Sequence, residues 1–150
     1  MRYHGRDLRR GRFSQAGRVY LVTTVTLERA SIFSDFHVGR CIPLALRQIE
    51  VERSANSLAW VVMPDHVHWL LALGNGDLCR VVQRFESRSA RAVNLQRGRS
   101  GRVWQKGFHD HALRTEEDLQ ATARYVIANP LRAGLVRRVG DYPLWDAIWL

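Results

Sequence analysis

The chain has 150 residues, which is enough for one domain and too few for two of ordinary size. Hydrophobic residues make up 46% of it and charged residues 25%, which is the composition of a globular protein and excludes an intrinsically disordered one. Lysine and arginine outnumber aspartate and glutamate by 23 to 14, and the excess is almost all arginine. A net charge of +9 indicates a polyanionic partner, usually nucleic acid and sometimes a membrane surface.

Membrane and secretory classes are not supported by the sequence. No apolar run approaches the ~20 residues of a membrane span. The basic N-terminus is not followed by the apolar stretch of a secretory signal. Cys41 and Cys79 are too few for a disulfide framework and lack the spacing of a metal site. We therefore expect a cytoplasmic protein without a membrane partner, consisting of a basic flexible arm over residues 1–18 and one folded domain over residues 19–150.

Strands and helices alternate along the predicted domain. In chain order the pattern predicts a strand at Val19–Thr26, a helix at Ser34–Arg53, strands at Leu58–Val62 and His66–Leu73, a helix from Asp77 to about Gln96, an irregular or bent strand within Val103–Arg114, and a helix from Thr115 to about Asn129. Pro43 lies inside the first helix, which therefore kinks there or begins nearby. The order predicts an α+β fold, the ferredoxin-like split βαβ arrangement with a terminal helix added. A four-stranded antiparallel sheet of this kind carries two helices on one face and leaves the other face free.

The strand His66–Leu73 carries the first candidate site. Alternate residues of a strand share a face, so the apolar row Val67, Trp69, Leu71 and Leu73 should lie against the two core helices. His66 and His68 then project side by side from the opposite face, as half of a metal site or as two hydrogen-bonded histidines without chemistry. Position 70 is leucine, so the third histidine of a histidine-triad nucleotide hydrolase is missing. A structural zinc site is a further alternative, with His109 and His111 as additional ligands.

The last predicted helix reads TEEDLQATARYVIANP and carries the second candidate site. Its apolar stripe comprises Leu119, Ala123, Val126 and Ile127. Tyr125 and Asn129 are neighbours at the flank of this stripe, because they are four residues apart. Purely structural roles also explain them, as a half-buried anchor and a helix terminator. Together with His66 and His68, however, they form a set in which an amide oxygen and two imidazoles hold a divalent cation and a tyrosine attacks a phosphodiester.

These motifs carry a family resemblance. MPDHVHWLL, followed later by YVIANPLRAGLV, resembles the paired motifs of the REP-associated tyrosine transposases. These are single-tyrosine transposases of the His-hydrophobe-His endonuclease superfamily. The segments GRVYLVTTVT and WQKGFHDHALR are also similar to that family, and the resemblance extends from about Gly17 to Tyr142.

The resemblance implies a ferredoxin-like catalytic domain that cleaves single-stranded DNA through a 5′-phosphotyrosine and leaves a free 3′-hydroxyl. It implies Tyr125 as the nucleophile, and His66, His68 and Asn129 as ligands of Mg²⁺ or Mn²⁺. Related enzymes recognise a short guide sequence beside a hairpin in repetitive extragenic palindromes. We therefore expect single-stranded DNA with a hairpin as the partner, and a monomer or a homodimer as the protein.

Arginine-rich segments are expected to follow the DNA backbone, although solvated helix faces explain them equally well. The residues that we assign to DNA binding are Arg9, Arg10, Arg12, Arg88, Arg91, Arg114 and Arg132. Phe108 and Trp104 are candidates for base stacking, with a core position the stronger expectation for Trp104. Two alternatives to a strand-cleaving transposase stay open, namely a catalytically idle, domesticated DNA-binding protein and a zinc-stabilised regulator.

Overall fold

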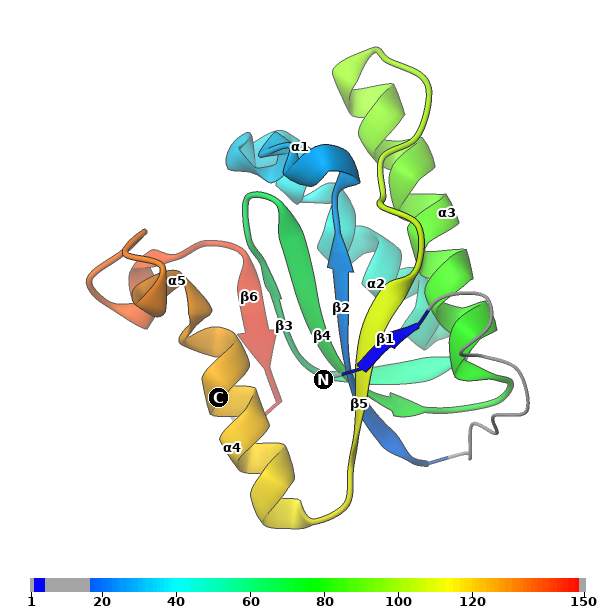
Figure 1. Ribbon diagram of the computed structural model, residues 1–150, viewed down its shortest axis with the longest axis vertical. Coiled ribbons are helices and arrows are strands. Elements are labelled where there is room, and N and C mark those ends of the chain that lie inside the picture. Colours follow the sequence, from blue (N-terminus) through cyan, green and yellow to red (C-terminus); the bar gives the residue numbers. More distant parts are fainter. Residues whose placement is uncertain (1, 5–16, 149–150) are drawn as a thin grey trace.

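A computed structural model describes residues 2–4 and 17–148 of the chain (Figure 1). One antiparallel sheet runs through it, with the strand order β1-β5-β2-β4-β3-β6. The strands are β1 (Arg2–His4), β2 (Val19–Val25), β3 (Ala55–Val62), β4 (His66–Leu73), β5 (Phe108–Leu113) and β6 (Trp145–Ala147). The helices are α1 (Phe36–Gly39), α2 (Cys41–Val51), α3 (Leu78–Arg97), α4 (Glu116–Ile127) and α5 (Asn129–Arg132), with single 3₁₀ turns η2 (Leu27–Arg29), η3 (Ile32–Ser34) and η4 (Val139–Asp141). None of the helices in this part of the chain is long and apolar enough to cross a membrane.

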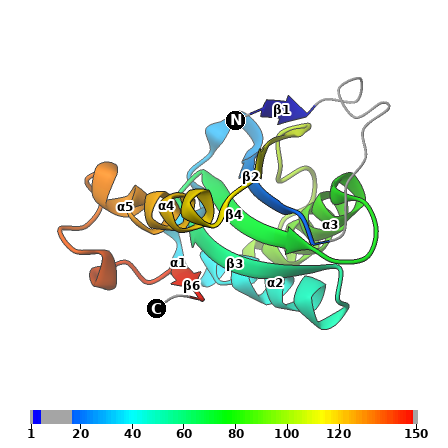
Figure 2. The ribbon, with the colours of Figure 1, turned by 90° about the horizontal axis from the view of Figure 1, so that it is seen from below.

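The predicted ferredoxin-like core is confirmed. Strands β5, β2, β4 and β3 form its four-stranded sheet, and α2 and α3 are the two crossover helices that cover one face (Figure 2). The helix predicted over residues 34–53 is divided at Arg40 into α1 and α2. Pro43 explains the division, because its missing N–H cannot bond the carbonyl of Gly39 four residues earlier. Side-chain caps fix the predicted starts of α3 and α4: Asp77 accepts a hydrogen bond from the backbone N–H of Cys79, and Thr115 accepts one from the backbone N–H of Asp118.

The main hydrophobic core lies between the sheet and these two helices. The predicted apolar row of β4 forms its floor, and Ile42, Leu46, Val82 and Phe85 of the helices are each 0–1% exposed above it. The rings of Trp69 and Phe85 pack against each other at a tilt of 47°, with their centroids 5.3 Å apart. Burying several such side chains, each contributing about 1.5–3 kcal/mol, makes this sheet a rigid base for whatever stands on its other face.

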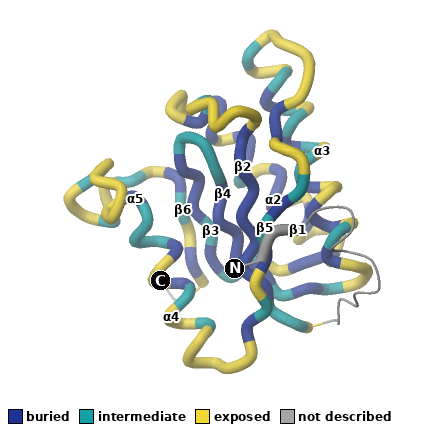
Figure 3. The backbone as a smooth tube through the Cα atoms, viewed as in Figure 1, coloured by how far each residue is buried: buried dark blue, intermediate teal, exposed yellow. Residues whose placement is uncertain are grey.

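The expectation that this other face is free is wrong. Helix α4 lies across it, and a second, smaller core fills the space between them (Figure 2). Ala123 and Val126 of the predicted stripe are buried against Leu21, Val61 and Leu70 of the sheet. The reason is the composition of these central strands, which present apolar residues on both faces and need cover on both. Figure 3 shows the central strands buried along most of their length.

The sheet is also wider than predicted. Three-residue strands extend it at both edges: β1 pairs with β5, and β6 pairs with β3. Residues 2–4 of the predicted flexible arm therefore belong to the sheet, which corrects the prediction for these residues. Backbone hydrogen bonds also tie Gly17 and Arg18 to Leu73. Residues 5–16 lie outside the described residues, and with them the predicted DNA-binding residues Arg9, Arg10 and Arg12.

Candidate active site

The two histidines of β4 lie side by side on the face that α4 covers. Their ring centroids are 4.9 Å apart, and the ring planes meet at 80°. Strand alternation alone places them on this face, as predicted. Their position on a central strand, hydrogen-bonded to neighbours on both sides, fixes their backbone in the most rigid part of the molecule.

His68 is the buried member of the pair, with 8% of its surface exposed. Its Nδ1 lies 2.8 Å from Oγ1 of Thr23, which is directly opposite on β2. Burial, and then the charges of His66 and Arg132, lower the pKa of His68 from 6.5 to about 3. The ring is therefore neutral at physiological pH. When its Nδ1–H donates to Thr23, the lone pair of Nε2 can coordinate a metal ion.

His66 is oriented by a carboxylate. Its Nδ1 lies 2.7 Å from Oδ1 of Asp65, whose other oxygen accepts a hydrogen bond of 3.1 Å from Arg29. Burial by itself raises the pKa of Asp65, but His66 and then Arg29 outweigh this effect, so the pKa lies below its usual value. Since a carboxylate only accepts, Nδ1–H of His66 donates to it and Nε2 is left as the free acceptor.

The turn that carries Arg29 has unusual backbone geometry. Glu28 and Arg29 both have left-handed φ values, 57° and 51°. Residues other than glycine rarely adopt this backbone conformation, because it costs roughly 1 kcal/mol or more for each residue. Thr26, which is fully buried, holds the turn closed, because its hydroxyl donates to the carbonyls of Ala30 and Asp65. The strained turn therefore keeps Arg29 beside Asp65.

The remaining two predicted residues, Tyr125 and Asn129, lie on α4 and at the start of α5. Nδ2 of Asn129 lies 3.4 Å from Nε2 of His66, although 63 residues separate them in sequence. Tyr125 is 53% exposed, and the guanidinium of Arg132 lies 3.7 Å from the centre of its ring. The four predicted residues Tyr125, Asn129, His66 and His68, here called the site quartet, thus come from three elements. Strand β4 carries the histidines, α4 carries Tyr125, and α5 begins with Asn129.

The donor set of the quartet fits a divalent cation. Both histidines have Nδ1 engaged by a protein group, which leaves two Nε2 atoms on one side. A half-turn of the Asn129 amide exchanges its nitrogen for its oxygen and presents that oxygen beside His66. By contrast, no group of three or more His, Cys, Asp and Glu residues that could hold a metal occurs within the described ranges. His109 and His111, on β5, therefore do not complete a four-ligand zinc site with the pair on β4 in this part of the chain.

The predicted DNA contacts are dispersed. Arg132 stands at the quartet, and Arg91 and Arg114 are exposed elsewhere on the surface. Arg88 lies on α3, on the opposite side of the sheet, where it donates two hydrogen bonds of 2.7 and 2.5 Å to Glu52. The structure thus brings one of the four described arginines to the quartet, and the assignment of the others to DNA stays a prediction.

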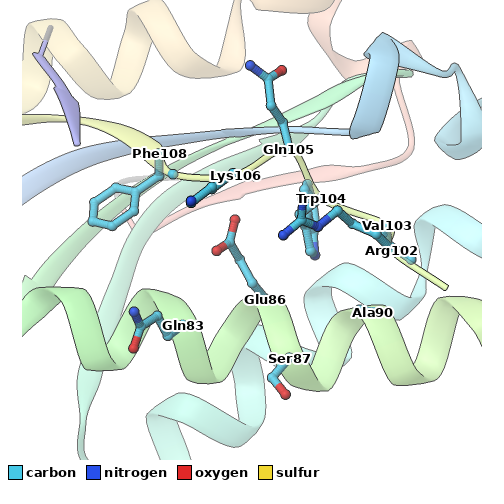
Figure 4. A pocket seen from close by; sticks show the side chains of 11 residues that line it. Gln83, Glu86, Ser87, Ala90, Arg102, Val103, Trp104, Gln105, Lys106 and Phe108 are labelled. Carbon is cyan, nitrogen blue, oxygen red and sulfur yellow. The ribbon is translucent and has the colours of Figure 1, made fainter. Parts of the chain in front are cut away.

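Two proposed stacking residues are core residues. Trp104 is 5% exposed and Phe108 is 2% exposed. The indole N–H of Trp104 donates to Ser89, and its ring packs against Phe33 and Phe85. Neither ring can stack on a base without leaving the core. The core position expected for Trp104 is confirmed, and the expectation that Phe108 stacks on bases is wrong. Both rings line a cavity of about 570 Å³ between α3 and residues 102–108, and no member of the quartet lines it (Figure 4).

Comparison with known proteins identifies the family to which the chain belongs. The family model described as Transposase IS200 like matches residues 16–129, most of the chain, and the chain therefore belongs to that family. It is 30% identical to the REP-associated tyrosine transposase of Escherichia coli strain K12 over 101 residues, 66% of this chain and 58% of that protein. The present chain thus spans less than two thirds of the length of that relative.

Two further comparisons agree. A Haemophilus influenzae protein, provisionally given the same name, is 25% identical over 138 residues, or 85% of this chain and 78% of its own. A solved structure of a REP-associated tyrosine transposase bound to a REP hairpin superimposes with a TM-score of 0.73 at 23% identity, covering 89% of this chain and 79% of that one. This likeness confirms the fold.

Three residues that support the quartet were missed by sequence reasoning, namely Thr23, Asp65 and Arg29. Asp65 could have been found, because it directly precedes His66 and acidic residues commonly orient ligating histidines. Thr23 is reached only through the register of β2 against β4, which pairs it with His68. Arg29 depends on a left-handed turn for which the sequence has no glycine or asparagine as a signal.

Proposed function

We propose that this protein is a metal-dependent single-stranded DNA endonuclease and strand transferase, in which Tyr125 forms a 5′-phosphotyrosine intermediate at a palindromic hairpin. The observation that carries the proposal is the contact of Asn129 with His66, because it joins the tyrosine helix to the histidine pair. Tyr125 lies one helical turn before Asn129 and is 53% exposed, which supports a role for its hydroxyl in attack on a phosphodiester at the cation site.

In the proposed step, Oη of Tyr125 attacks the phosphorus of a phosphodiester. The bond between phosphorus and the 3′ oxygen breaks, and that oxygen takes up a proton and leaves as a free 3′-hydroxyl. The phenolic proton passes to solvent, and the 5′ phosphate stays on the tyrosine as an ester. Attack by another 3′-hydroxyl reverses the step and joins two strands, so no external energy source is needed.

The histidines and the amide act as ligands in this proposal. His66, His68 and Asn129 would hold Mg²⁺ or Mn²⁺, which supplies charge neutralisation at the phosphate when bound. Asp65 and Thr23 keep the two rings in the tautomers that present Nε2. Mg²⁺ prefers oxygen ligands, so a site with two nitrogens binds it loosely and leaves positions for phosphate oxygens and water.

The net charge of the chain and its family support hairpin-bearing single-stranded DNA as the proposed substrate. A net charge of +9 suits a polyanion, and the solved relative described above is bound to a hairpin. Single strands allow the in-line approach that a duplex restricts. Affinity for single-stranded DNA should fall with salt at a log–log slope of about −0.7 for each phosphate that is neutralised. Affinity that does not change with salt would contradict contact with a phosphate backbone.

The decisive experiment is incubation with labelled hairpin-bearing single-stranded DNA and Mn²⁺, followed by a denaturing gel and peptide mapping. A covalent adduct on the peptide that contains Tyr125 is expected. Tyr125→Phe should bind DNA but form no adduct, because phenylalanine has no atom that can form the ester. Tyr20→Phe is the matched control, since it removes a hydroxyl from a buried strand tyrosine, and it should form the adduct normally. A label on another tyrosine, or cleavage by Tyr125→Phe, would refute the assignment.

The ligand role has its own test. His66→Ala and His68→Ala should abolish cleavage and leave most DNA binding, because arginines rather than histidines supply the charge. Cleavage at the parental rate by either variant would show that the histidine pair is structural. A protein that binds hairpin DNA tightly but never forms the adduct, with any divalent cation, would be the idle DNA-binding protein instead.

A further inference from the structure

The geometry points to a role for Arg132 beyond a contact with the DNA backbone: it is the positioning residue for Tyr125, holding the ring by stacking and placing positive charge beside the attacking oxygen. This inference rests on the proposed function, which makes Tyr125 the nucleophile. It assigns to Arg132 a part in the chemical step, in place of the general DNA affinity expected from its charge alone.

The contact itself is specific. The central carbon of the Arg132 guanidinium lies 3.7 Å from the centre of the Tyr125 ring, which is the distance of a planar group stacked on a ring face. A cation at this distance is attracted by the negative face of the ring. Since Tyr125 is 53% exposed, its side chain is only partly enclosed by the protein, and the stacked guanidinium restrains its ring. Within the described part of the chain, no carboxylate forms an ion pair with Arg132 and competes for its guanidinium.

The local backbone explains why these two side chains meet. Helix α4 ends at Ile127, Ala128 keeps right-handed helical angles, and α5 begins at Asn129. The chain therefore continues in helical conformation through Arg132. Residues seven apart lie on the same side of a helix after two turns, so Arg132 follows Tyr125 on one side and Asn129 stands between them. Nucleophile, ligand and guanidinium thus succeed one another along one surface.

The charge of Arg132 lies beside the proposed attacking group, because its guanidinium is stacked on the ring of Tyr125. During attack, negative charge develops on the phosphate and on the oxygen that leaves, and a fixed cation there stabilises the transition state more than the ground state.

Single-turnover cleavage at saturating DNA separates positioning from DNA affinity. The substrate is hairpin-bearing single-stranded DNA with Mn²⁺, and the variants are Arg132→Gln, Arg132→Lys and, as the matched control, Arg124→Gln. Arg124 is also exposed, near the end of α4, the helix that carries Tyr125, so its replacement removes the same charge without removing the stacked group. We expect Arg132→Gln to slow adduct formation by about tenfold to a hundredfold, because a misplaced nucleophile costs rate even when binding is saturated. Arg124→Gln should stay within about twofold of the parent, and both Gln variants should bind DNA similarly.

The outcomes are distinct. A parental rate for Arg132→Gln, or a deficit that disappears as DNA is raised, would reduce Arg132 to a DNA contact and overturn the inference. Arg132→Lys keeps the charge without the planar group and should remain slower than the parent. Full recovery by lysine would refute the stacking.

A measurement without DNA keeps this inference separate from the proposed function. In the NMR spectrum, the ring current of Tyr125 should shift the side-chain protons of Arg132 upfield, and Tyr125→Leu should abolish the shift. Absence of the shift in the parent protein would refute the contact, whatever the protein does to DNA. A shift that is present in a protein that never cleaves DNA would instead refute the proposed function and leave the contact standing.

Discussion

Acid should destabilise this protein through one buried histidine. Burial, together with the charges of His66 and Arg132, lowers the pKa of His68 from 6.5 to about 3. In the unfolded chain the ring takes up a proton near pH 6.5, whereas in the folded chain it stays neutral until about pH 3. Between these values the unfolded state binds one more proton, so the free energy of unfolding falls as the pH is lowered.

The magnitude follows from the two pKa values. The stabilisation that comes from keeping the ring neutral is complete above the unfolded value and is lost progressively toward the folded one. Each pH unit well inside this window costs about 1.4 kcal/mol, and lowering the pH from 7 to 5 costs about 2 kcal/mol, because the first part of the interval lies above the unfolded pKa. Solvent screening reduces this little, since His68 is only 8% exposed.

Urea denaturation of the metal-free protein at both pH values measures the effect. Other groups also titrate in this range, so the comparison is with His68→Gln, whose side chain has no charge at either pH. The parent should lose about 2 kcal/mol more than this variant between pH 7 and pH 5. His111→Gln removes an exposed imidazole from β5 and should behave like the parent. Equal losses in the parent and His68→Gln would refute the argument that burial keeps His68 neutral.

Three further substitutions test neighbouring contacts. Thr23→Val removes the hydrogen-bond partner of Nδ1 of His68, so the affinity for Mn²⁺, measured by calorimetric titration, should fall about tenfold to a hundredfold. Unchanged affinity would show that the Thr23 hydroxyl does not orient the ring. Thr24→Val should leave stability unchanged or raise it by up to about 1 kcal/mol in urea, because its buried hydroxyl has no hydrogen-bond partner within the described ranges; a marked loss would refute this. Tyr142→Phe should lower stability by about 1 kcal/mol in a thermal melt, because it removes the hydroxyl that donates to the carbonyl of Val62. A variant as stable as the parent would show that this hydrogen bond contributes nothing to stability.

The local parts of the site could be predicted from the sequence. Period-two alternation in β4 put His66 and His68 on one face. Helical spacing put Tyr125 and Asn129 together at the flank of the last predicted helix, which the structure divides into α4 and α5. These inferences succeed because they depend only on the geometry of a single element. The core face of β4 was predictable for the same reason, since its apolar row is continuous.

The parts that could not be predicted depend on pairing between distant segments. Thr23 meets His68 across 45 residues because of strand register, and Asn129 meets His66 across 63 residues because α4 packs on the sheet. The cover of this face by α4 was missed, since the rule for antiparallel sheets with one free face was applied to strands that are apolar on both. The edge strand β6 is too short to show periodicity, and only its pairing with β3 defines it.

The short edge strands have a consequence for how the protein behaves when it is concentrated. A sheet edge exposes unpaired backbone groups, and an exposed edge of ordinary strand length can template pairing with another chain. Here both outer strands, β1 and β6, contain only three residues. An incoming strand finds too few ladder bonds on either side to offset its loss of conformational freedom. In the described part of the chain, each short strand therefore disfavours edge-to-edge pairing along the stretch of sheet that it covers.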